Sequence, residues 1–348
     1  MLRVLTVADI RGVRRILLPF ALVTAAAAAV VPMAGASQII DRNATGVTLL
    51  LNSKGEALVS YKAAGQVKHV LAWGAVDAIA PTRSGKQIAF QLDYTGGWGK
   101  YYLADPSVRL LQTKYQQIKF TPGYLTSPTT KALSAKSAFA KDYWRSSFHG
   151  SCGHYDGPKL AWMVAACKAP DGSYWALQAW QRALSNYGLG PTAAQAVWEL
   201  HLAHWTGALP VLTISTDWAW HQWDHLFGTF TYGGSPVYGF GSTPDGQPLD
   251  TFGRNLYVDT LDSAYGSGWK RENSFLTHTN TGAFCYSVNP HGSHPSGKGT
   301  TYRATIIGPG VTPDVMWQGA APPADDATAD ATANAAITAL NDAKCHPN

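Results

Sequence analysis

Val47-Thr-Leu-Leu-Leu51 and Ala57-Leu-Val-Ser-Tyr61 are two apolar runs separated by the turn residues Asn52-Ser-Lys-Gly55. Short runs of this kind, bounded by turn formers, predict β-strands. The alternation of apolar run and turn continues as far as Tyr94, where a Gly-rich segment follows. We therefore predict an amino-terminal β-meander within residues 37–112.

The middle of the chain predicts helices. Two compact apolar segments, 159–168 and 174–184, are joined by the turn Ala169-Pro-Asp-Gly172. A third segment begins at Pro191, and proline is a favourable first residue of a helix. Its apolar side chains recur at helical spacing as far as Trp205, so we predict a third helix there.

Strands return after Gly207, and the chain ends in an Ala-rich helix. The predicted strands are 210–215, 229–232, 237–240, 256–260, 283–288 and 301–307, and the predicted helix is 324–342. Residues 113–142 have no clear period and are interpreted as an irregular connection to a main domain over 143–348. The predicted fold class is α+β: β-rich, with an amino-terminal meander, central helices and carboxy-terminal antiparallel strands.

Residues 1–36 have the features of a cleavable export signal. Four Arg flank or precede an apolar run from Ile16 to Met33, and Ala34-Gly-Ala36 supplies the small residues that signal peptidase accepts. A membrane anchor is the alternative, because the run approaches the length that spans a bilayer. Two prolines interrupt the run and no basic stop-transfer flank follows it. We therefore favour cleavage before Ser37 and a chain that is secreted or held at the cell surface.

The composition limits the classes of partner. The formal net charge is +5, but the predicted signal holds four Arg and one Asp, which leaves +2 for the rest of the chain. That balance lacks the basic footprint of a nucleic-acid-binding protein, and no later segment has the length and apolar character of a membrane span. Charged residues make up only 14% of the chain, which has 13 Trp and 34 Gly, and this combination is typical of secreted β-rich proteins, including those that bind sugars.

All four cysteines lie after the predicted signal. Four cysteines allow three pairings, which sequence alone leaves open. We favour Cys152 with Cys167 and Cys285 with Cys345, because each pair is consecutive along the chain. No Cys-x-x-Cys or Cys/His spacing of the zinc type occurs, so we predict two disulfides formed in an oxidising compartment.

Three further segments are Asp93-Tyr-Thr-Gly-Gly-Trp-Gly99, Asp171-Gly-Ser-Tyr-Trp-Ala-Leu-Gln178 and Gly308-Pro-Gly-Val-Thr-Pro-Asp-Val-Met-Trp317. They resemble segments of uncharacterised secreted proteins from high-GC Gram-positive bacteria. The resemblance extends over most of the chain after the predicted signal. It implies export and a single co-linear unit, and it implies no activity because none is known for that group.

The densest cluster of reactive side chains is Asp217-Trp-Ala-Trp-His221-Gln-Trp-Asp224-His225. On a helix, the two Asp and the two His would share one face. His221 and His225 then have the spacing of two zinc ligands, and His-x-x-Asp-His resembles the inverted zinc-peptidase motif, with Asp224 in place of the Glu general base. Glu272 is the only downstream Glu that could complete such a site.

We favour a simpler interpretation, in which these side chains form the solvent-exposed face of an amphipathic helix. Zinc is then the less favoured alternative and no cofactor is expected. Asp217, Asp224 and Glu272 remain secondary candidates for catalysis, and His221 and His225 for a metal. As a surface pair, Asp224→Ala and His225→Ala are each expected to change the free energy of unfolding by less than about 1 kcal/mol.

Aromatic side chains suggest a different kind of site. Trp98, Trp218 and Trp220 could offer flat apolar faces to the C–H groups of a sugar. Trp98 lies between glycines, which favours its exposure; the alternative for any Trp is burial in the core. Secondary candidates are the histidines His201 and His204, the segment Lys270–Asn273 and the loop Pro290–Pro295.

No nucleophile elbow, phosphate-binding loop or dinucleotide fingerprint occurs in the chain. The favoured hypothesis is a secreted, non-enzymatic protein of the cell envelope with an aromatic-lined site for carbohydrate or wall polymer. The alternative is an extracellular hydrolase of wall polymer or peptide, with or without zinc at His221 and His225. A purely structural or protein-interaction role is the third possibility.

Overall fold

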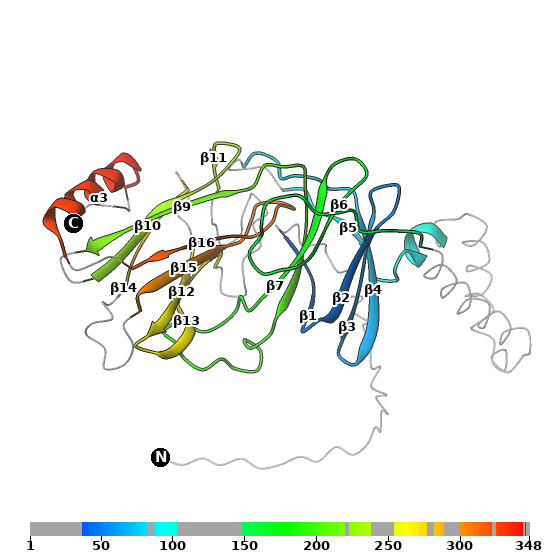
Figure 1. The fold of residues 1–348 in the computed structure, drawn as a ribbon, viewed down its shortest axis with the longest axis horizontal. Coiled ribbons are helices and arrows are strands. Elements are labelled where there is room, and N and C mark those ends of the chain that lie inside the picture. The colour runs from blue at the N-terminus through cyan, green and yellow to red at the C-terminus, as the bar shows by residue number, and fades with distance from the viewer. Residues whose placement is uncertain are drawn as a thin grey trace, which may run out of the picture. The chain divides into compact units, whose positions relative to one another are not determined.

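The computed structural model describes residues 37–81, 87–102, 148–219, 223–237, 254–276, 282–288, 299–321, 325–343 and 345. Within these ranges the chain forms four antiparallel sheets (Figure 1). The helical elements of the described ranges are the α-helix α3 (Ala327–Ala339) and a π-helical turn (Trp98–Tyr102). The predicted α+β class with central helices is therefore wrong, because the segments predicted as central helices contain β-strands and irregular structure instead.

The first sheet is the predicted meander. Its strands, in spatial order, are β2 (Thr45–Leu51), β3 (Ala57–Ala63), β4 (Gln66–Trp73) and β5 (Gln91–Asp93). The β2–β3 turn is closed by Asn52, whose side-chain oxygen accepts from the backbone N–H groups of Lys54 and Glu56 at 2.9 and 3.0 Å. This local hydrogen bonding explains why the turn residues predicted these strands correctly.

The segments predicted as central helices form the second sheet. Its strands, in spatial order, are β1 (Gln38–Arg42), β8 (Glu199–Trp205), β7 (Tyr174–Trp180) and β6 (Met163–Lys168). Every residue of β8 is buried, on both faces of the strand. Leu200 and Leu202 are buried in one apolar cluster, and Ala203 and Trp205 in another, so apolar side chains occur on both faces of the strand and their combined spacing also fits a helix.

These two sheets pack face to face and form what we call the amino-terminal sandwich. Its core is made of inward side chains from both sheets: Leu49, Val59, Val70, Trp175, Leu177, Leu200 and Leu202. Phe90 stacks on Trp175, with ring centroids 5.2 Å apart. Burial of large apolar and aromatic side chains is the main stabilising term for a sandwich of this kind.

The remaining two sheets form the carboxy-terminal sandwich. One contains β9 (Val211–Ala219), β10 (Trp223–Tyr232), β11 (Ser235–Pro236) and β14 (Ala283–Val288). The other contains β13 (Gly266–Phe275), β12 (Leu256–Ser263), β15 (Thr301–Ile306) and β16 (Val315–Ala320), in that spatial order. Leu226 and Phe230 from the first sheet share apolar clusters with Val258 and Ile306 from the second.

The predicted hairpin around Gly233-Gly234 is confirmed within the described residues. Thr231 pairs with Pro236 and Tyr232 with Ser235, which leaves the two glycines as the turn. Both have positive φ, 56° and 76°, as a two-residue hairpin turn requires. The end of the predicted partner strand, 238–240, lies outside the described residues.

The described ends of the segment predicted as the helix Asp217–His225, residues 217–219 and 223–225, belong to two paired strands. Trp218 is paired with Asp224, and Asp217 with His225, across β9 and β10. Because side chains alternate along a strand, Asp224 and His225 point to opposite faces of the sheet. Both are buried, with exposed fractions of 4% and 5%. The prediction of a solvent-exposed polar face is therefore wrong. It no longer supports the small changes in the free energy of unfolding that were expected for Asp224→Ala and His225→Ala.

The predicted carboxy-terminal helix is confirmed as α3. Asp326 is its N-cap and accepts from the backbone N–H groups of Thr328 and Ala329 at 2.8 and 3.0 Å. Ile337 packs from the helix against Phe227 and Ala283 of the carboxy-terminal sandwich. No helix in the described ranges is long and apolar enough to cross a membrane.

The predicted cysteine pairing is confirmed. Cys152–Cys167 and Cys285–Cys345 are disulfides, with Cα–Cα distances of 5.0 and 5.6 Å. The first joins β6 to the segment that precedes it, and the second joins β14 to the segment after α3. Two disulfides are typical of an oxidising, extracytoplasmic compartment.

Candidate functional site

An open pocket of about 550 Å³ lies at one side of the amino-terminal sandwich. It is bordered by β1, by the start of β4 and by the segment after β5. Its lining residues are Ile40, Asp41, Gln66, Val67, Lys68, His69, Tyr94 and Thr95. We refer to it as the Tyr94 pocket, because Tyr94 is 57% exposed and supplies its aromatic surface.

The buried carboxylate of Asp93 holds the Tyr94 segment in place. Its Oδ1 accepts from the backbone N–H and the hydroxyl of Thr95, at 2.8 and 2.5 Å. Its Oδ2 accepts from the backbone N–H of Lys100 at 2.7 Å. One side chain therefore fixes both ends of the Gly-rich loop, so Tyr94 and Thr95 enter the pocket wall on a preorganised backbone.

A charged pair forms the polar side of the Tyr94 pocket. Lys68 Nζ lies 2.6 Å from Asp41 Oδ2, and the backbone N–H of Arg42 donates to Asp41 Oδ1 at 2.8 Å. Burial opposes the charge on Asp41, but these hydrogen bonds outweigh it and hold the pKa of Asp41 below its ordinary value. Asp41 is therefore an ionised acceptor at neutral pH, and Lys68 is its side-chain donor.

Of the three Trp residues predicted as stacking platforms, the structure describes the side chain of Trp218, which does not line this pocket. Trp98 belongs to the loop that follows Tyr94, but its side chain lies outside the described residues, as does all of Trp220. Trp218 is half-buried on β9, where it is paired with Asp224. Tyr94 was not among the aromatic residues predicted from the sequence, although the Gly-rich segment beside it was a usable signal.

Two of the predicted catalytic candidates, Asp224 and Glu272, lie in one polar cluster inside the carboxy-terminal sandwich. The Tyr302 hydroxyl donates to Asp224 Oδ2 at 2.7 Å, and the Thr260 hydroxyl donates to Glu272 Oε2 at 3.0 Å. Burial raises the pKa of Asp224 to about 6. Burial, with the repulsion of the Asp224 carboxylate, raises the pKa of Glu272 to about 7.

Buried acids with raised pKa values are a common sign of a functional site. Here, however, Asp224 and Glu272 have exposed fractions of only 4% and 2%. A substrate reaches neither carboxylate in this structure. We therefore treat the cluster as a determinant of pH-dependent stability.

The third catalytic candidate, Asp217, is paired with a predicted metal ligand. His225 Nδ1 lies 2.8 Å from Asp217 Oδ1, and both side chains are buried. His221, the other predicted zinc ligand, lies outside the described residues. Among the residues that the structure describes, no group of three His, Cys, Asp or Glu side chains is placed to hold a metal.

His201 and His204 do not form a pair either. They are three residues apart on β8, so they point to opposite faces of the sheet. His204 stacks on Trp175, with centroids 3.9 Å apart, and its ring nitrogens contact Ser173 Oγ and the Ala75 carbonyl. Lys270–Asn273 lies within β13, and Pro290–Pro295 lies outside the described residues.

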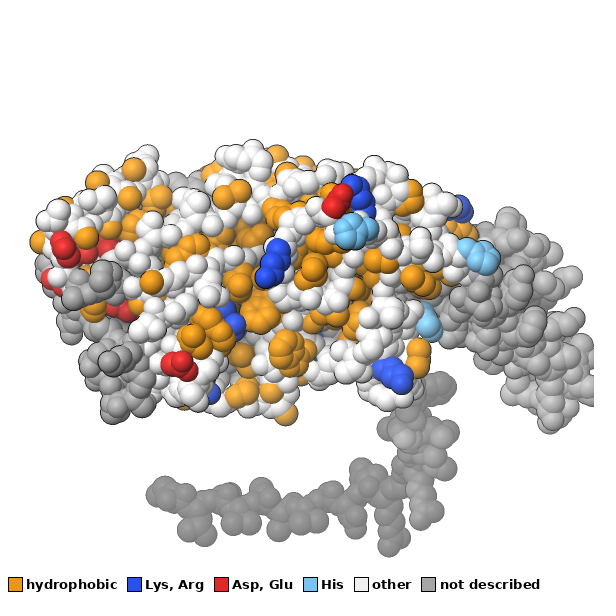
Figure 2. Space-filling view, viewed as in Figure 1, with side chains coloured by type: hydrophobic (Ala, Val, Ile, Leu, Met, Phe, Trp, Pro, Cys, Tyr) orange, Lys and Arg blue, Asp and Glu red, His pale blue; other side chains and the backbone are white. Residues whose placement is uncertain are grey.

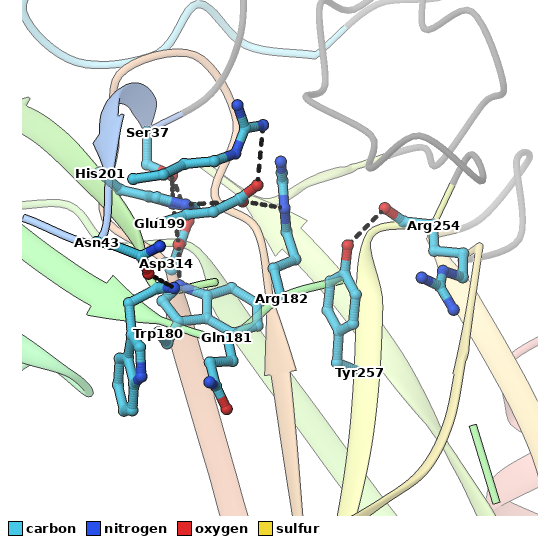
Figure 3. A network of polar contacts seen from close by, with 12 residues as sticks. Ser37, Asn43, Trp180, Gln181, Arg182, Glu199, His201, Arg254, Tyr257 and Asp314 are labelled. Carbon is cyan, nitrogen blue, oxygen red and sulfur yellow. Dashed lines mark hydrogen bonds and ion pairs between the residues drawn. The ribbon is translucent and has the colours of Figure 1, made fainter. Parts of the chain in front are cut away.

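His201 belongs to a buried ionic network that was not predicted from the sequence (Figure 3). Ser37 Oγ lies 2.5 Å from Asp314 Oδ1 and 3.1 Å from His201 Nδ1, which is 2.9 Å from Asp314 Oδ2. Trp180 Nε1 donates to Asp314 Oδ2 at 2.9 Å. Ser37 and Asp314 have exposed fractions of 0%, and His201 of 1%.

Glu199 extends the network. Its Oε2 lies 2.8 Å from Arg182 Nε and 3.4 Å from His201 Nε2, and its Oε1 lies 3.2 Å from Arg42. Although burial opposes the charge, His201 and Arg182 lower the pKa of Glu199 to about 2. Burial likewise opposes the charges of Asp314 and His201, but their mutual attraction lowers the pKa of Asp314 and raises that of His201.

Ser37, His201 and Asp314 have the residue types of a hydrolytic triad but not its geometry. In a triad, serine contacts one ring nitrogen of histidine and aspartate contacts the other. Here both Ser37 and Asp314 contact Nδ1. All three side chains are also closed to solvent. The network is consequently structural, and it contains no nucleophile that a substrate can approach.

No protein-family model, curated protein or solved structure matches the chain. Its function is therefore inferred from its own residues. The face drawn in Figure 2 carries isolated charged side chains among hydrophobic and uncharged polar ones. That distribution agrees with a chain in which only 14% of the residues are charged.

Proposed function

We propose that this chain is a secreted protein that binds carbohydrate in the Tyr94 pocket without chemically changing it. The observation that carries the proposal is the combination of an exposed aromatic side chain with charged and amide hydrogen-bonding groups in one open pocket. Sugars present both C–H faces and hydroxyl groups, so their sites need these two kinds of surface together. Export follows from the signal features of residues 1–36.

The lining favours a neutral glycan. Lys68 and Asp41 neutralise each other across 2.6 Å, so the pocket wall offers donors and acceptors without a net charge from this pair. Vicinal hydroxyls can receive a hydrogen bond from Lys68 and donate one to Asp41. Gln66 adds an amide with both functions, and the exposed face of Tyr94 is available for the C–H groups.

Hydrolysis receives less support than binding. Among the described residues, Asp224 and Glu272 are the carboxylates whose pKa values are raised to about 6 and about 7, and both are buried within the carboxy-terminal sandwich. Among the described residues that line it, the Tyr94 pocket has one acidic side chain, that of Asp41, whose pKa is lowered. A general acid needs a proton to donate near neutral pH, which Asp41 does not hold.

Tyr94→Ala should weaken glycan binding by roughly tenfold, which corresponds to about 1.4 kcal/mol, because the aromatic face is removed. Tyr94→Phe keeps the face and should retain most of the affinity. The measurement is a screen of neutral hexose oligosaccharides, followed by calorimetry on the best ligand.

Trp198→Ala is the matched control, since Trp198 is 47% exposed and is not part of the pocket lining. It should bind like the wild type. If no neutral oligosaccharide binds the wild type, or if Tyr94→Ala and Trp198→Ala bind equally well, the proposed site is wrong.

A further inference from the structure

Ser37 is both the first residue after the predicted export signal and a member of the buried network in Figure 3. Its Oγ lies 2.5 Å from Asp314 Oδ1. The backbone nitrogen of a serine lies within about 4 Å of its own Oγ, whatever the rotamer. A charged amino group at Ser37 would therefore be about 6.5 Å or less from a fully buried carboxylate.

The network has more buried carboxylates than buried arginine side chains, so a positively charged amino group can pair with one of them. Asp314 and Glu199 are two buried carboxylates, and Arg182 is the one permanently charged base buried with them among the described network residues. Arg42 reaches Glu199 from the surface, with its side chain 56% exposed. When residue 37 is joined to residue 36 by a peptide bond, the second buried positive charge has to come from protonated His201.

We propose that cleavage before Ser37 produces an α-ammonium group that pairs with Asp314 and completes this network. The proposal goes beyond glycan binding and rests on the export part of the proposed function. Signal peptidase adds water across the peptide bond, so residue 36 leaves as a carboxylate and Ser37 keeps the amine, which takes a proton. His201 can then lose its proton, because the new ammonium replaces the charge that it carried.

The network joins parts of the chain that are distant in sequence, so the new ion pair stabilises more than the terminus. β1 is an edge strand whose pairing with β8 begins at Gln38 and Leu202. Asp314 accepts from the backbone N–H of Gly308 at 3.2 Å, and its own backbone bonds to Gln178 through both N–H and C=O, at 2.9 Å each. Processing thus fixes β1, β7 and the turn before β16 at one point.

The test compares three forms of the otherwise identical chain: one beginning at Ser37, one with a single Gly before Ser37, and one beginning at an Nα-acetylated Ser37. The Gly form keeps an amino group but moves it away from Asp314. We expect the Ser37 form to melt at least several degrees higher than the other two at pH 7. The difference should be complete below the ordinary α-amino pKa of about 8 and should vanish as pH rises through the raised folded value.

Asp314→Asn in all three forms is the second arm, and it should abolish the difference between them. Because that substitution can prevent folding, the α-amino pKa of the wild-type Ser37 form is measured independently by isotope labelling of the terminus and NMR. We expect it at least one unit above about 8, which is a tenfold tighter hold on the proton.

Equal melting temperatures of the three wild-type forms, or an unshifted α-amino pKa, would overturn the proposal. Glycan binding by the Ser37 form is measured on the same samples, so failure of the terminal ion pair is distinguished from failure of the Tyr94 pocket. Amino-terminal sequencing of the exported protein tests the cleavage position separately.

Discussion

Glu272→Gln is expected to stabilise the folded protein at pH 8 by about 3 kcal/mol and to leave its stability at pH 4 nearly unchanged. Burial and the neighbouring Asp224 raise the pKa of Glu272 from 4.5 to about 7. At pH 8 the wild type holds a buried charge that the amide does not carry. Thr260 can still donate to the amide oxygen as it does to Oε2 of the carboxylate, at 3.0 Å.

The sign of this change in stability with pH follows from proton linkage. An acid whose pKa is higher in the folded state stabilises the fold at low pH, and that stabilisation is lost as pH rises through the folded value. The window runs from 4.5 to about 7 for Glu272 and from 3.8 to about 6 for Asp224. The wild type should therefore be more stable at pH 5 than at pH 8, as measured by urea unfolding at both values.

Glu199→Gln is the matched control of opposite sign. The pKa of Glu199 is lowered to about 2 despite its burial, because His201 and Arg182 favour its charge. Its contribution is present above pH 4.5 and is lost only as pH falls toward 2. The variant should destabilise the protein at pH 8 by roughly 3 to 5 kcal/mol, since it leaves Arg182 buried without its partner. If Glu272→Gln also destabilises at pH 8, our account of the acid pair fails.

Replacing Cys285 and Cys345 together with Ala should lower the free energy of unfolding by about 4 kcal/mol, the largest loss that we expect from a disulfide here. The bond closes a separation of 60 residues, and it holds the end of α3 to β14. Phe227 and Ile337 form a buried cluster with Cys345 beside this bond. Once the bond is removed, α3 should open locally and become sensitive to protease before the sandwich unfolds.

The paired replacement of Cys152 and Cys167 is the control. That bond closes a separation of 15 residues, for which the same chain-entropy estimate is about 3 kcal/mol. It should leave the protease resistance of α3 unchanged, because it lies in the amino-terminal sandwich. Equal sensitivity of α3 in both variants would show that the Cys285–Cys345 bond does not hold the helix in place.

The sequence alone determined the features that depend on neighbouring residues. The meander followed from apolar runs and turn residues, such as Asn52, that bond within a few positions. The hairpin at Gly233-Gly234 and the helix α3 have the same local origin. The disulfide pairing was correct because each cysteine bonds its nearest neighbour in the sequence.

Only the tertiary structure decided the class of the middle segments. β8 is hydrogen-bonded to β1 and β7 at its edges and is buried on both faces, so apolar side chains occur on both faces and their spacing also fits a helix. The same ambiguity turned Asp217–His225 into a predicted helix, whereas pairing of β9 with β10 puts Asp224 and His225 on opposite faces. Strand pairing is a non-local choice that the spacing of one segment does not reveal.

The candidate sites depended on the tertiary structure in the same way. Asp41 and Tyr94 border one pocket because β1 pairs with β8 of the second sheet and not with a strand of the meander. No sequence feature near either residue indicates this pairing. Ser37 and Asp314 are 277 positions apart and meet in one hydrogen bond. The sequence supplied the chemical groups and predicted their compartment, but long-range strand pairing determined which groups became neighbours and which were buried.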